Sequence, residues 1–262
     1  MIGITGGNGV LGKILIHKYN KKNQEISVFT GDITIFDEVN KWLFENQINQ
    51  IVHLASKVAV KDVQNNLSRA YDVNIAGTIN LIKAIEFNKS KVFFFYASSS
   101  HVYKSSKFPL AETDTVEPIN SYGLTKYISE MVLNDYKKNN PEFGLCIGRI
   151  FSFFHESQKP PFLYPNLIQR FQNDDLKKPF HLFGALSTRD FLNADDVCDI
   201  IIKLVAKKQE GTVNVASGKS IRIIDFVEKI APIKLNFTYD INEKQNHLNA
   251  DTSLLNKILE NE

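Results

Sequence analysis

A glycine-rich turn near the start of the chain restricts the possible folds more than any other feature. Residues 4–12 read Ile-Thr-Gly-Gly-Asn-Gly-Val-Leu-Gly, between a short apolar run and a helical pattern over Val10–Lys21. In such a strand–turn–helix, Gly6 allows the tight turn, Gly9 lets backbone N–H groups approach a pyrophosphate, and Gly12 lets the helix pack closely on the strand. The helix N-terminus favours the negative charge. The turn therefore predicts a dinucleotide-binding unit.

Apolar runs and helical patterns alternate through the first half of the chain. The expected strands are Ile2–Thr5, Ile26–Phe29, Ile51–Leu54, Val92–Ala97 and Leu145–Phe151, and the expected helices after the first are Asp37–Asn46, Ser68–Phe87 and Tyr122–Lys137. Strands that are apolar on both faces and alternate with helices indicate a parallel sheet covered on both sides. The prediction is an α/β fold of the Rossmann type, with a doubly wound parallel sheet.

The pattern changes after Phe151. Prolines interrupt it near residues 160–165, and the later elements are expected to be a helix beginning over Asn166–Phe171, strands at Arg189–Leu192, Val213–Ala216 and Leu235–Asp240, and helices at Ala194–Lys207 and Ile223–Ile230. We expect residues 1–150 to form the nucleotide-binding domain. Residues 151–262 are expected to form a small C-terminal substrate lobe, interleaved with the last elements of the nucleotide-binding domain.

Composition and charge narrow the class of protein. Hydrophobic residues make up 43% of the 262 residues, which is enough for a large core. The net charge of +2 gives no reason to expect a nucleic-acid or membrane partner. No apolar run approaches the roughly 20 residues of a membrane-spanning helix, and the glycine turn starts too early for a preceding signal peptide. Cys146 and Cys198 lie in apolar runs and suit buried thiols better than a disulfide, so a cytoplasmic location is expected.

A second signature lies near the middle of the chain. Ser98-Ser99-Ser100 ends an expected strand, and Tyr122 and Lys126 are four residues apart on an expected helix, so both point from one face. A tyrosine of ordinary pKa near 10 is a poor acid–base group at neutral pH, and a neighbouring ammonium lowers that pKa. Ser99 would hydrogen-bond a carbonyl oxygen as negative charge develops on it. Together with the glycine turn, this set predicts redox chemistry on an alcohol or ketone with a nicotinamide coenzyme.

With this glycine turn and this Ser/Tyr/Lys set, the chain resembles the extended short-chain dehydrogenases/reductases of the nucleotide-sugar epimerase/dehydratase group. The resemblance covers nearly the whole length and also includes the segments 53–56, 73–78, 98–103, 149–151, 189–191 and 195–197. It implies an enzyme with Ser99, Tyr122 and Lys126 as catalytic residues and a nucleotide-sugar substrate. It implies a homodimer as well, built on the helices Ser68–Phe87 and Tyr122–Lys137, although the same faces could pack only on the sheet. No metal ion is expected.

The resemblance assigns binding roles residue by residue. Asn74 would support the loop after the third strand. The expected coenzyme-binding residues are Gly6, Asn8, Gly9, Val10, Leu11, Gly12, Asp32, Ile33, Leu54, Ala55, Ser56, Tyr122, Lys126 and Phe151. The expected substrate-binding residues are Lys57, Ser99, Ser100, His101, Tyr122, Ser152, Asn166 and Arg189. Arg189 would meet the nucleotide diphosphate, or alternatively form a surface ion pair with a residue such as Asp190.

The choice between NAD and NADP stays open. Asp32 lies 20 residues beyond Gly12 and could bind the adenosine ribose, which favours NAD. However, Gly31-Asp32-Ile33-Thr34 before a helix resembles a later loop of the family that contacts adenine, as if the segment between the second and third strands were deleted. No arginine stands near this position in the sequence to bind a 2′-phosphate.

Departures from the family pattern bear on the reaction. Sugar 4,6-dehydratases of this group place Asp and Glu after the catalytic hydroxyl, where this chain has Ser100 and His101. Dehydration is therefore not expected, and His101 is either a substrate contact or a structural polar residue. The compact lobe resembles 4-keto-6-deoxy-sugar reductases and predicts NAD(P)H-dependent reduction at C4 for surface polysaccharide synthesis. The alternatives are a C4 epimerase with the same acid–base residues and a non-catalytic NAD(P)-binding scaffold.

Overall fold

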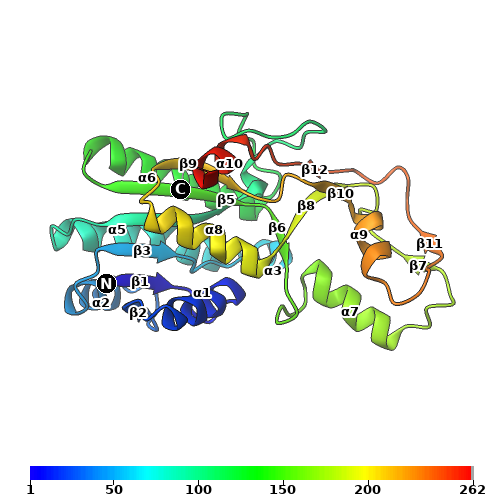
Figure 1. Cartoon of the computed structure of the whole chain (residues 1–262), viewed down its shortest axis with the longest axis horizontal. Helices are drawn as coiled ribbons and strands as arrows, with labels where there is room; N and C mark the ends of the chain where they lie inside the picture. The colour runs from blue at the N-terminus through cyan, green and yellow to red at the C-terminus, as the bar shows by residue number, and fades with distance from the viewer. Residues whose placement is uncertain (261–262) are drawn as a thin grey trace.

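The centre of the molecule is a six-stranded parallel sheet in the order β2-β1-β3-β4-β5-β9 (Figure 1). The computed structural model describes residues 1–260. The six strands are β1 (Ile2–Thr5), β2 (Ile26–Val28), β3 (Gln50–His53), β4 (Phe93–Ser99), β5 (Gly144–Ile150) and β9 (Gly211–Val215). The predicted Rossmann-type α/β fold is confirmed, and β2 forms the edge of the sheet directly beside β1.

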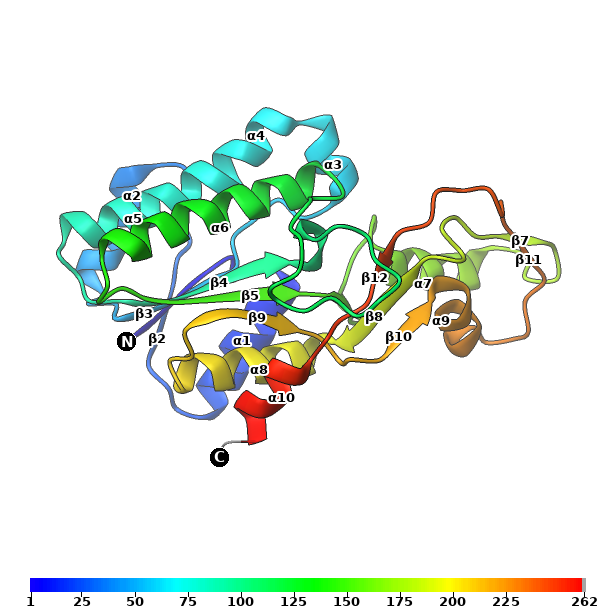
Figure 2. The same ribbon diagram turned by 90° about the horizontal axis from the view of Figure 1, so that it is seen from above.

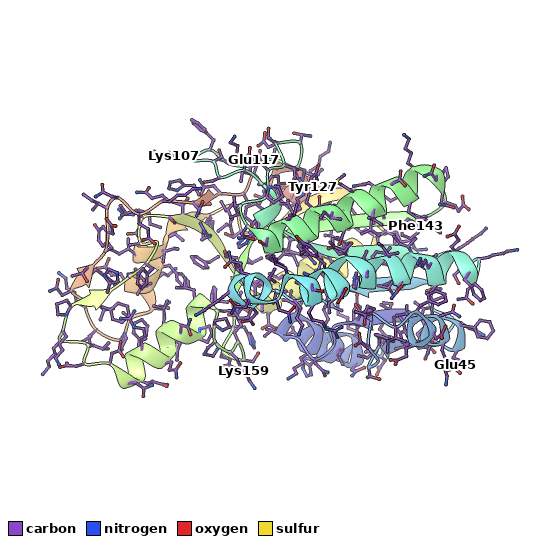
Figure 3. All side chains as sticks on the ribbon, turned by 180° about the vertical axis from the view of Figure 1, so that it is seen from behind. Glu45, Lys107, Glu117, Tyr127, Phe143 and Lys159 are labelled. Atoms are coloured by element: carbon purple, nitrogen blue, oxygen red, sulfur yellow. The ribbon has the colours of Figure 1, made fainter. Side chains whose placement is uncertain are left out.

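Helices cover both faces of this sheet (Figure 2). One face carries α2 (Phe36–Glu45), α3 (Val60–Asn65), α4 (Leu67–Tyr71), α5 (Gly77–Phe87) and α6 (Ser121–Asn139), and the other carries α1 (Val10–Lys21), α8 (Ala194–Ala206) and α10 (Ser253–Glu260). Successive side chains of β4 point to opposite faces, so Phe94 packs among the residues under α5 and α6 while Phe95 packs under α1 and α8. Phe143 lies beneath α6 in the first of these layers (Figure 3).

A smaller lobe projects from the carboxyl end of the sheet (Figure 1). It contains β6 (Ser152–Phe154), β7 (Phe180–His181), β8 (Thr188–Asn193), β10 (Ser220–Arg222), β11 (Phe237–Thr238) and β12 (His247–Leu248), with α7 (Leu163–Asn173) and α9 (Ile223–Ile230). Its own apolar core includes Phe191 and Phe226, whose rings stack with centroids 4.0 Å apart. Between these lobe elements the chain returns through α8 and β9 to the central sheet.

Most expected elements agree with the observed ones to within one or two residues at each end, and three differ in kind, start or extent. The single helix expected over Ser68–Phe87 contains a π-helical turn at Asp72–Ala76, between α4 and α5. The helix expected from Asn166 begins at Leu163, because Pro165 lies in the first turn, where its missing N–H leaves no hydrogen bond unmade. The strand expected over Leu235–Asp240 is paired only at Phe237–Thr238, with β7.

The structure bears on two of the sequence-based expectations, those about membrane-spanning helices and about the two cysteines. Within residues 1–260, no helix is both long and apolar enough to cross a membrane. Cys146 and Cys198 are both buried free thiols, so the structure contains no disulfide between them.

Candidate active site

The residues singled out in the sequence meet at the carboxyl edge of the sheet. The glycine turn follows β1, the segment Leu54–Ser56 follows β3, and Ser99 is the last residue of β4. Parallel strands present their carboxyl ends at one edge, which is where ligands bind in sheets of this type. The backbone N–H of Ala55 donates to Thr5 Oγ1 over 3.2 Å, so the turn after β1 and the loop after β3 are in direct contact.

The glycine turn fits a dinucleotide pyrophosphate. Gly6 has a φ of 73°, and a Cβ at Gly12 would lie 2.3 Å from the carbonyl oxygen of Gly6. A side chain at Gly12 would push the helix away from the turn, and one at Gly6 would meet the backbone N of Ala55 at 2.6 Å and strain the positive φ. The N-cap of α1 is Gly9, which offers no side-chain cap, so the N–H groups of the first turn, at Val10, Leu11 and Gly12, stay available to an anion.

The start of α6 brings Tyr122 to the end of β4. The Asn120 side chain caps the helix by accepting the Gly123 N–H over 2.9 Å. A Cβ at Gly123 would lie 2.1 Å from the carbonyl oxygen of His101, so glycine lets α6 begin directly against the 3₁₀ turn Ser100–Val102. This close approach places Tyr122 within hydrogen-bonding reach of Ser99.

The electrostatics of Tyr122 differ from the sequence-based prediction. Burial raises the pKa of Tyr122 to about 12, and the hydrogen bond with Ser99 only partly opposes this rise. A lowered pKa caused by Lys126 was expected. The ammonium of Lys126 instead lies over the ring of Tyr96, with Nζ 4.4 Å from the ring centroid. Tyr122 therefore stays protonated at neutral pH in the free protein, where it is a weaker acid than an ordinary tyrosine.

Lys126 is buried on the face of α6 that meets the sheet. Burial lowers its pKa to about 7, against the opposing charge of Glu130, which lies one turn further along α6. A lysine with this pKa exists in both the neutral and the protonated form at neutral pH. The position of Lys126 one turn after Tyr122 agrees with the predicted spacing, and its amine remains a hydrogen-bond donor in either form.

A buried ion pair, which the sequence did not indicate, lies beside Lys126. Arg149 donates from Nη2 to Glu130 Oε2 over 2.8 Å and from Nε to Glu130 Oε1 over 3.2 Å, and Ser98 donates to the same Oε1. Ser98 and Arg149 are direct partners in the β4–β5 register, so both reach α6 from the sheet. The signal available in the sequence was Glu130, which is four residues after Lys126 and therefore on the same buried face.

Asn74 lies in the π-helical turn and joins three segments. Its side-chain oxygen accepts the Lys57 N–H over 2.7 Å, and its side-chain nitrogen donates to the Lys57 carbonyl and to Thr125 Oγ1. Its carbonyl oxygen accepts from Ser129 on α6. The expected support of the loop after β3 is therefore present, and it extends to the helix that carries Tyr122 and Lys126.

The expected substrate-binding residues fall into two groups. His101 lies against Tyr122, and the two rings meet edge to face with centroids 5.7 Å apart. Burial first, and the charge of Arg189 second, lower the pKa of His101 to about 4, so this imidazole is neutral at pH 7. Arg189 donates to the carbonyl oxygens of Thr188 and Asn246. The alternative surface pair with Asp190 does not form, since Asp190 is buried and accepts from Ser217.

Four other residues that were expected to contact the substrate or the coenzyme lie deeper in the protein or farther from Tyr122. Ser100 is buried in the 3₁₀ turn, and Ser152 begins β6 opposite Phe191 of β8. Asn166 donates to the Pro161 carbonyl and lines a separate cavity of about 520 Å³ between α7 and residues 182–183, which follow β7. The Phe151 side chain is buried against Tyr103, so it supports the loop that follows β4.

The loop after β2 brings together residues that the sequence left apart. Asp32 accepts from Thr34 and from Arg69, and the distance from Arg69 Nη2 to Asp32 Oδ2 is 2.9 Å. Ile33 is buried against Gly77, where a Cβ would lie 2.8 Å from Ile33 Cγ2. The sequence around Asp32 contains no arginine, but Arg69 on α4 reaches Asp32 in the folded chain. Arg69 could not be found by spacing, since 37 residues separate the pair.

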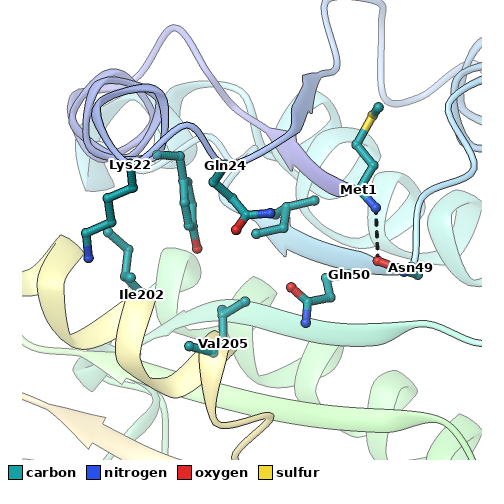
Figure 4. A pocket seen from close by; sticks show the side chains of 10 residues that line it. Met1, Lys22, Gln24, Asn49, Gln50, Ile202 and Val205 are labelled. Carbon is teal, nitrogen blue, oxygen red and sulfur yellow. Dashed lines mark hydrogen bonds between the residues drawn. The ribbon is translucent and has the colours of Figure 1, made fainter.

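A different cavity lies at the amino-terminal ends of the strands, away from the candidate active site (Figure 4). It has a volume of about 490 Å³ and is lined by the first residues of β1 and β3 and by the ends of α1 and α8. It contains none of the expected catalytic residues, so it is not part of the candidate active site. Among residues 1–260, no group of three or more His, Cys, Asp or Glu side chains could hold a metal ion.

The sheet, the turn and the buried hydroxyl and lysine residues are those of an extended short-chain dehydrogenase/reductase. The family model described as GDP-mannose 4,6 dehydratase matches residues 4–258. The chain belongs to this family of NAD-dependent epimerases, dehydratases and dehydrogenases that act on nucleotide sugars.

Individual relatives differ in the reaction for which they are named. The chain is 31% identical over 254 residues to a GDP-6-deoxy-D-talose 4-dehydrogenase from Aggregatibacter actinomycetemcomitans, covering 94% of this chain and 83% of that protein. It is 25% identical over 287 residues to a UDP-glucose 4-epimerase from Mycoplasma genitalium, covering 90% and 83%.

Solved structures agree on the fold. The RMD protein from Pseudomonas aeruginosa, complexed with NADPH, has a TM-score of 0.86 at 21% identity and covers 98% of this chain and 91% of its own. The Thermus thermophilus UDP-glucose 4-epimerase, complexed with NAD, has a TM-score of 0.83 at 18% identity and covers 99% and 92%.

Proposed function

We propose that the protein reduces the C4 ketone of a nucleotide-activated 4-keto-6-deoxyhexose with NADH or NADPH. The observation that carries the proposal is the placement of Tyr122 at the start of α6, packed directly against the 3₁₀ turn that follows Ser99 at the carboxyl end of β4. A protonated phenol is the form needed to deliver a proton to a ketone oxygen during reduction. The 31% identical relative, which is named for the C4 position of a GDP-bound 6-deoxy sugar, supports the same substrate class.

Each catalytic residue has a defined task in this reaction. A coenzyme held by the glycine turn and the loop after β3 would supply the hydride for C4. Tyr122 donates its proton to the carbonyl oxygen, and the Ser99 hydroxyl hydrogen-bonds that oxygen as negative charge develops on it. Lys126 would offer its amine donors to the ribose of the coenzyme. Arg189, held by two backbone carbonyls, would meet the diphosphate of the sugar nucleotide.

The residues around this set fit the binding of both ligands. The coenzyme would be held by the turn Gly6–Gly12, the loop after β2, and Leu54, Ala55 and Ser56 after β3. The sugar would lie near Ser100, His101 and Ser152, with the neutral imidazole of His101 facing it. The product would serve as a donor in surface polysaccharide synthesis, and the enzyme would act in the cytoplasm as a homodimer.

The test is an assay of the purified protein with each reduced coenzyme. The near-ultraviolet absorbance of the reduced nicotinamide is followed in the presence of GDP- and dTDP-linked 4-keto-6-deoxyhexoses and of unmodified sugar nucleotides. Loss of one coenzyme molecule per molecule of keto sugar reduced supports the proposal, and Tyr122→Phe serves as the inactive control. No loss with any keto sugar contradicts it.

A C4 epimerase is the second candidate. The Mycoplasma genitalium relative is named for this reaction and aligns with 90% of the chain. An epimerase would convert unmodified sugar nucleotides with no net consumption of coenzyme, because the hydride that leaves C4 returns to it. Interconversion of the C4 stereoisomers without any absorbance change would therefore favour this candidate over reduction.

A further inference from the structure

His101 lies in the 3₁₀ turn directly after β4, and hydrogen bonds hold it at three points. Its backbone N–H donates to Ser99 Oγ over 3.2 Å, and its carbonyl oxygen accepts the Ile119 N–H over 3.1 Å. Its ring atom Nδ1 lies 2.9 Å from Nδ2 of Asn120. The residue therefore has a fixed position at the carboxyl edge of the sheet, where the other site residues meet.

The orientation of the Asn120 amide follows from the cap that this residue forms on α6. A backbone N–H can only donate, so the atom that meets the Gly123 N–H over 2.9 Å is the amide oxygen. The opposite orientation would place the NH₂ group against the Gly123 N–H, with two donors facing each other. The amide nitrogen therefore faces His101, and it can only donate to Nδ1.

This contact selects one form of the imidazole ring. A neutral imidazole carries its proton on one nitrogen, and Nδ1 accepts from Asn120, so the proton is on Nε2. Burial first, and the charge of Arg189 second, lower the pKa of His101 to about 4, so the neutral form dominates at pH 7. A ring in this form can donate through Nε2 but cannot act as a base there.

The remaining polar atom of the ring, Nε2, is open to a ligand. It has no hydrogen-bond partner within residues 1–260 and is not fully buried. The ring meets that of Tyr122 edge to face, so it lies beside the proposed proton donor. The charged group nearest to it in effect is the guanidinium of Arg189, which also only donates. A ligand group that meets Nε2 must therefore be a hydrogen-bond acceptor, such as a sugar oxygen.

We propose that Asn120 is a positioning residue that locks His101 as a neutral Nε2–H donor, and that this donor binds a sugar oxygen on a carbon beside the reacting ketone. Ser99 and Tyr122 already supply donors to the ketone oxygen itself. His101 thus selects sugars that offer an acceptor at the neighbouring place. The identity of the substrate rests on the proposed function, whereas the lock on His101 can be observed without any substrate.

The lock is tested by ¹⁵N NMR of the full-length protein labelled at histidine, because ¹⁵N shifts distinguish a protonated from an unprotonated ring nitrogen. The chain has six histidines, and the signals missing from His101→Gln assign His101. The wild type should show a protonated Nε2 and an unprotonated Nδ1 at pH 7. In Asn120→Asp the carboxylate still caps α6 but can only accept from His101, so the proton should move to Nδ1 and the pKa of His101 should rise.

The donor is tested by steady-state kinetics with a GDP-linked 4-keto-6-deoxyhexose and reduced coenzyme. His101→Phe keeps an aromatic ring and loses the Nε2–H, so KM should rise by about three- to tenfold while kcat changes by less than about twofold. His101→Gln keeps an N–H donor at the end of its side chain and should recover part of this loss. Asn120→Asp should raise KM in the same way as His101→Phe, although its imidazole is intact.

The matched control is Asn66→Asp. Asn66 also caps a helix, α4, by accepting the Arg69 N–H over 3.0 Å, and within residues 1–260 no histidine bonds to its amide. This substitution adds the same charge at a helix start, and it should leave the His101 signals and KM unchanged. An equal rise of KM in Asn66→Asp and Asn120→Asp would refute the role of the lock.

The remaining outcomes separate the lock, the donor and the proposed function. A wild-type His101 protonated on Nδ1, or signals that do not respond to Asn120→Asp, would overturn the lock. An unchanged KM in His101→Phe would overturn the donor. If the protein reduces no keto sugar, the proposed function fails, and the His101 Nε2 signal is then followed on addition of the same GDP-linked sugar and of UDP-glucose. A shift with either sugar nucleotide supports the donor, and no shift with both refutes it.

Discussion

Removal of the Glu130 side chain tests the buried ion pair under the active site. The side chains of Glu130 and Arg149 are 3% and 7% exposed, so neither charge is solvated by water. Glu130→Ala deprives Arg149 of two hydrogen bonds and Ser98 of its acceptor. The guanidinium would keep only its bond to the Glu112 carbonyl and its position over the Tyr103 ring.

The expected cost follows from this loss. Breaking a buried pair by deleting one partner typically costs about 3–5 kcal/mol, because the other charge remains buried and unpaired. For a chain of this size, the melting temperature should fall by roughly 6–20 °C. Glu130→Gln should cost less than the alanine variant, since an amide oxygen can still accept from Arg149. The assay is urea unfolding at neutral pH, followed by circular dichroism and Trp42 fluorescence.

The matched control is Glu117→Ala. Glu117 pairs with Lys104 over 2.9 Å, but both side chains are more than half exposed. Loss of this pair should cost less than about 1 kcal/mol. If Glu130→Ala also cost less than about 1 kcal/mol, the argument that this charge pair is desolvated and essential to the fold would be wrong.

Three further predictions concern the site. Tyr122→Phe should lower kcat by about a hundredfold or more while coenzyme binding measured by calorimetry stays nearly unchanged, and activity within tenfold of wild type would exclude Tyr122 as the proton donor. Burial, and then the charge of Lys126, lower the pKa of His53 to about 3 in the folded state. The unfolded chain takes up that proton near pH 6.5, so stability should fall as the pH drops from 6.5 towards 3, and the melting temperature of His53→Gln should depend less on pH across this window. A Cβ in Gly12→Ala would lie 2.3 Å from the Gly6 carbonyl oxygen, so this variant should lose coenzyme affinity, and unchanged titration with NADH and NADPH would contradict the role of the turn.

The comparison of expected and observed elements shows where local patterns suffice. The turn over residues 4–12, the strand–helix alternation and the Tyr122–Lys126 spacing are local features, and each is found in the structure as expected. Strand ends and helix starts follow from short-range sterics and hydrogen bonding, which neighbouring residues specify. The parallel order then brings those ends to one edge, because each helix must cross back over the sheet.

The π-helical turn at Asp72–Ala76 could not be predicted from local patterns. The apolar spacing over Ser68–Phe87 is that of an ordinary helix and does not reveal the extra residue in the turn. In this turn, Asn74 accepts hydrogen bonds from the Lys57 N–H and the Ser129 hydroxyl and donates one to Thr125 Oγ1. These partners come from two other segments, so only tertiary packing could specify them.

The sequence by itself determined the class of the fold, the glycine cradle and the identity of the hydroxyl and amine groups at the site. Tertiary structure alone decided their chemical state and their neighbours. Burial against the sheet raises the pKa of Tyr122, which the spacing to Lys126 had suggested would fall. Chain folding brings Arg69 to Asp32 and Arg149 to Glu130. Solvation and long-range charge depend on everything packed around a group, and no local pattern of residues contains that information.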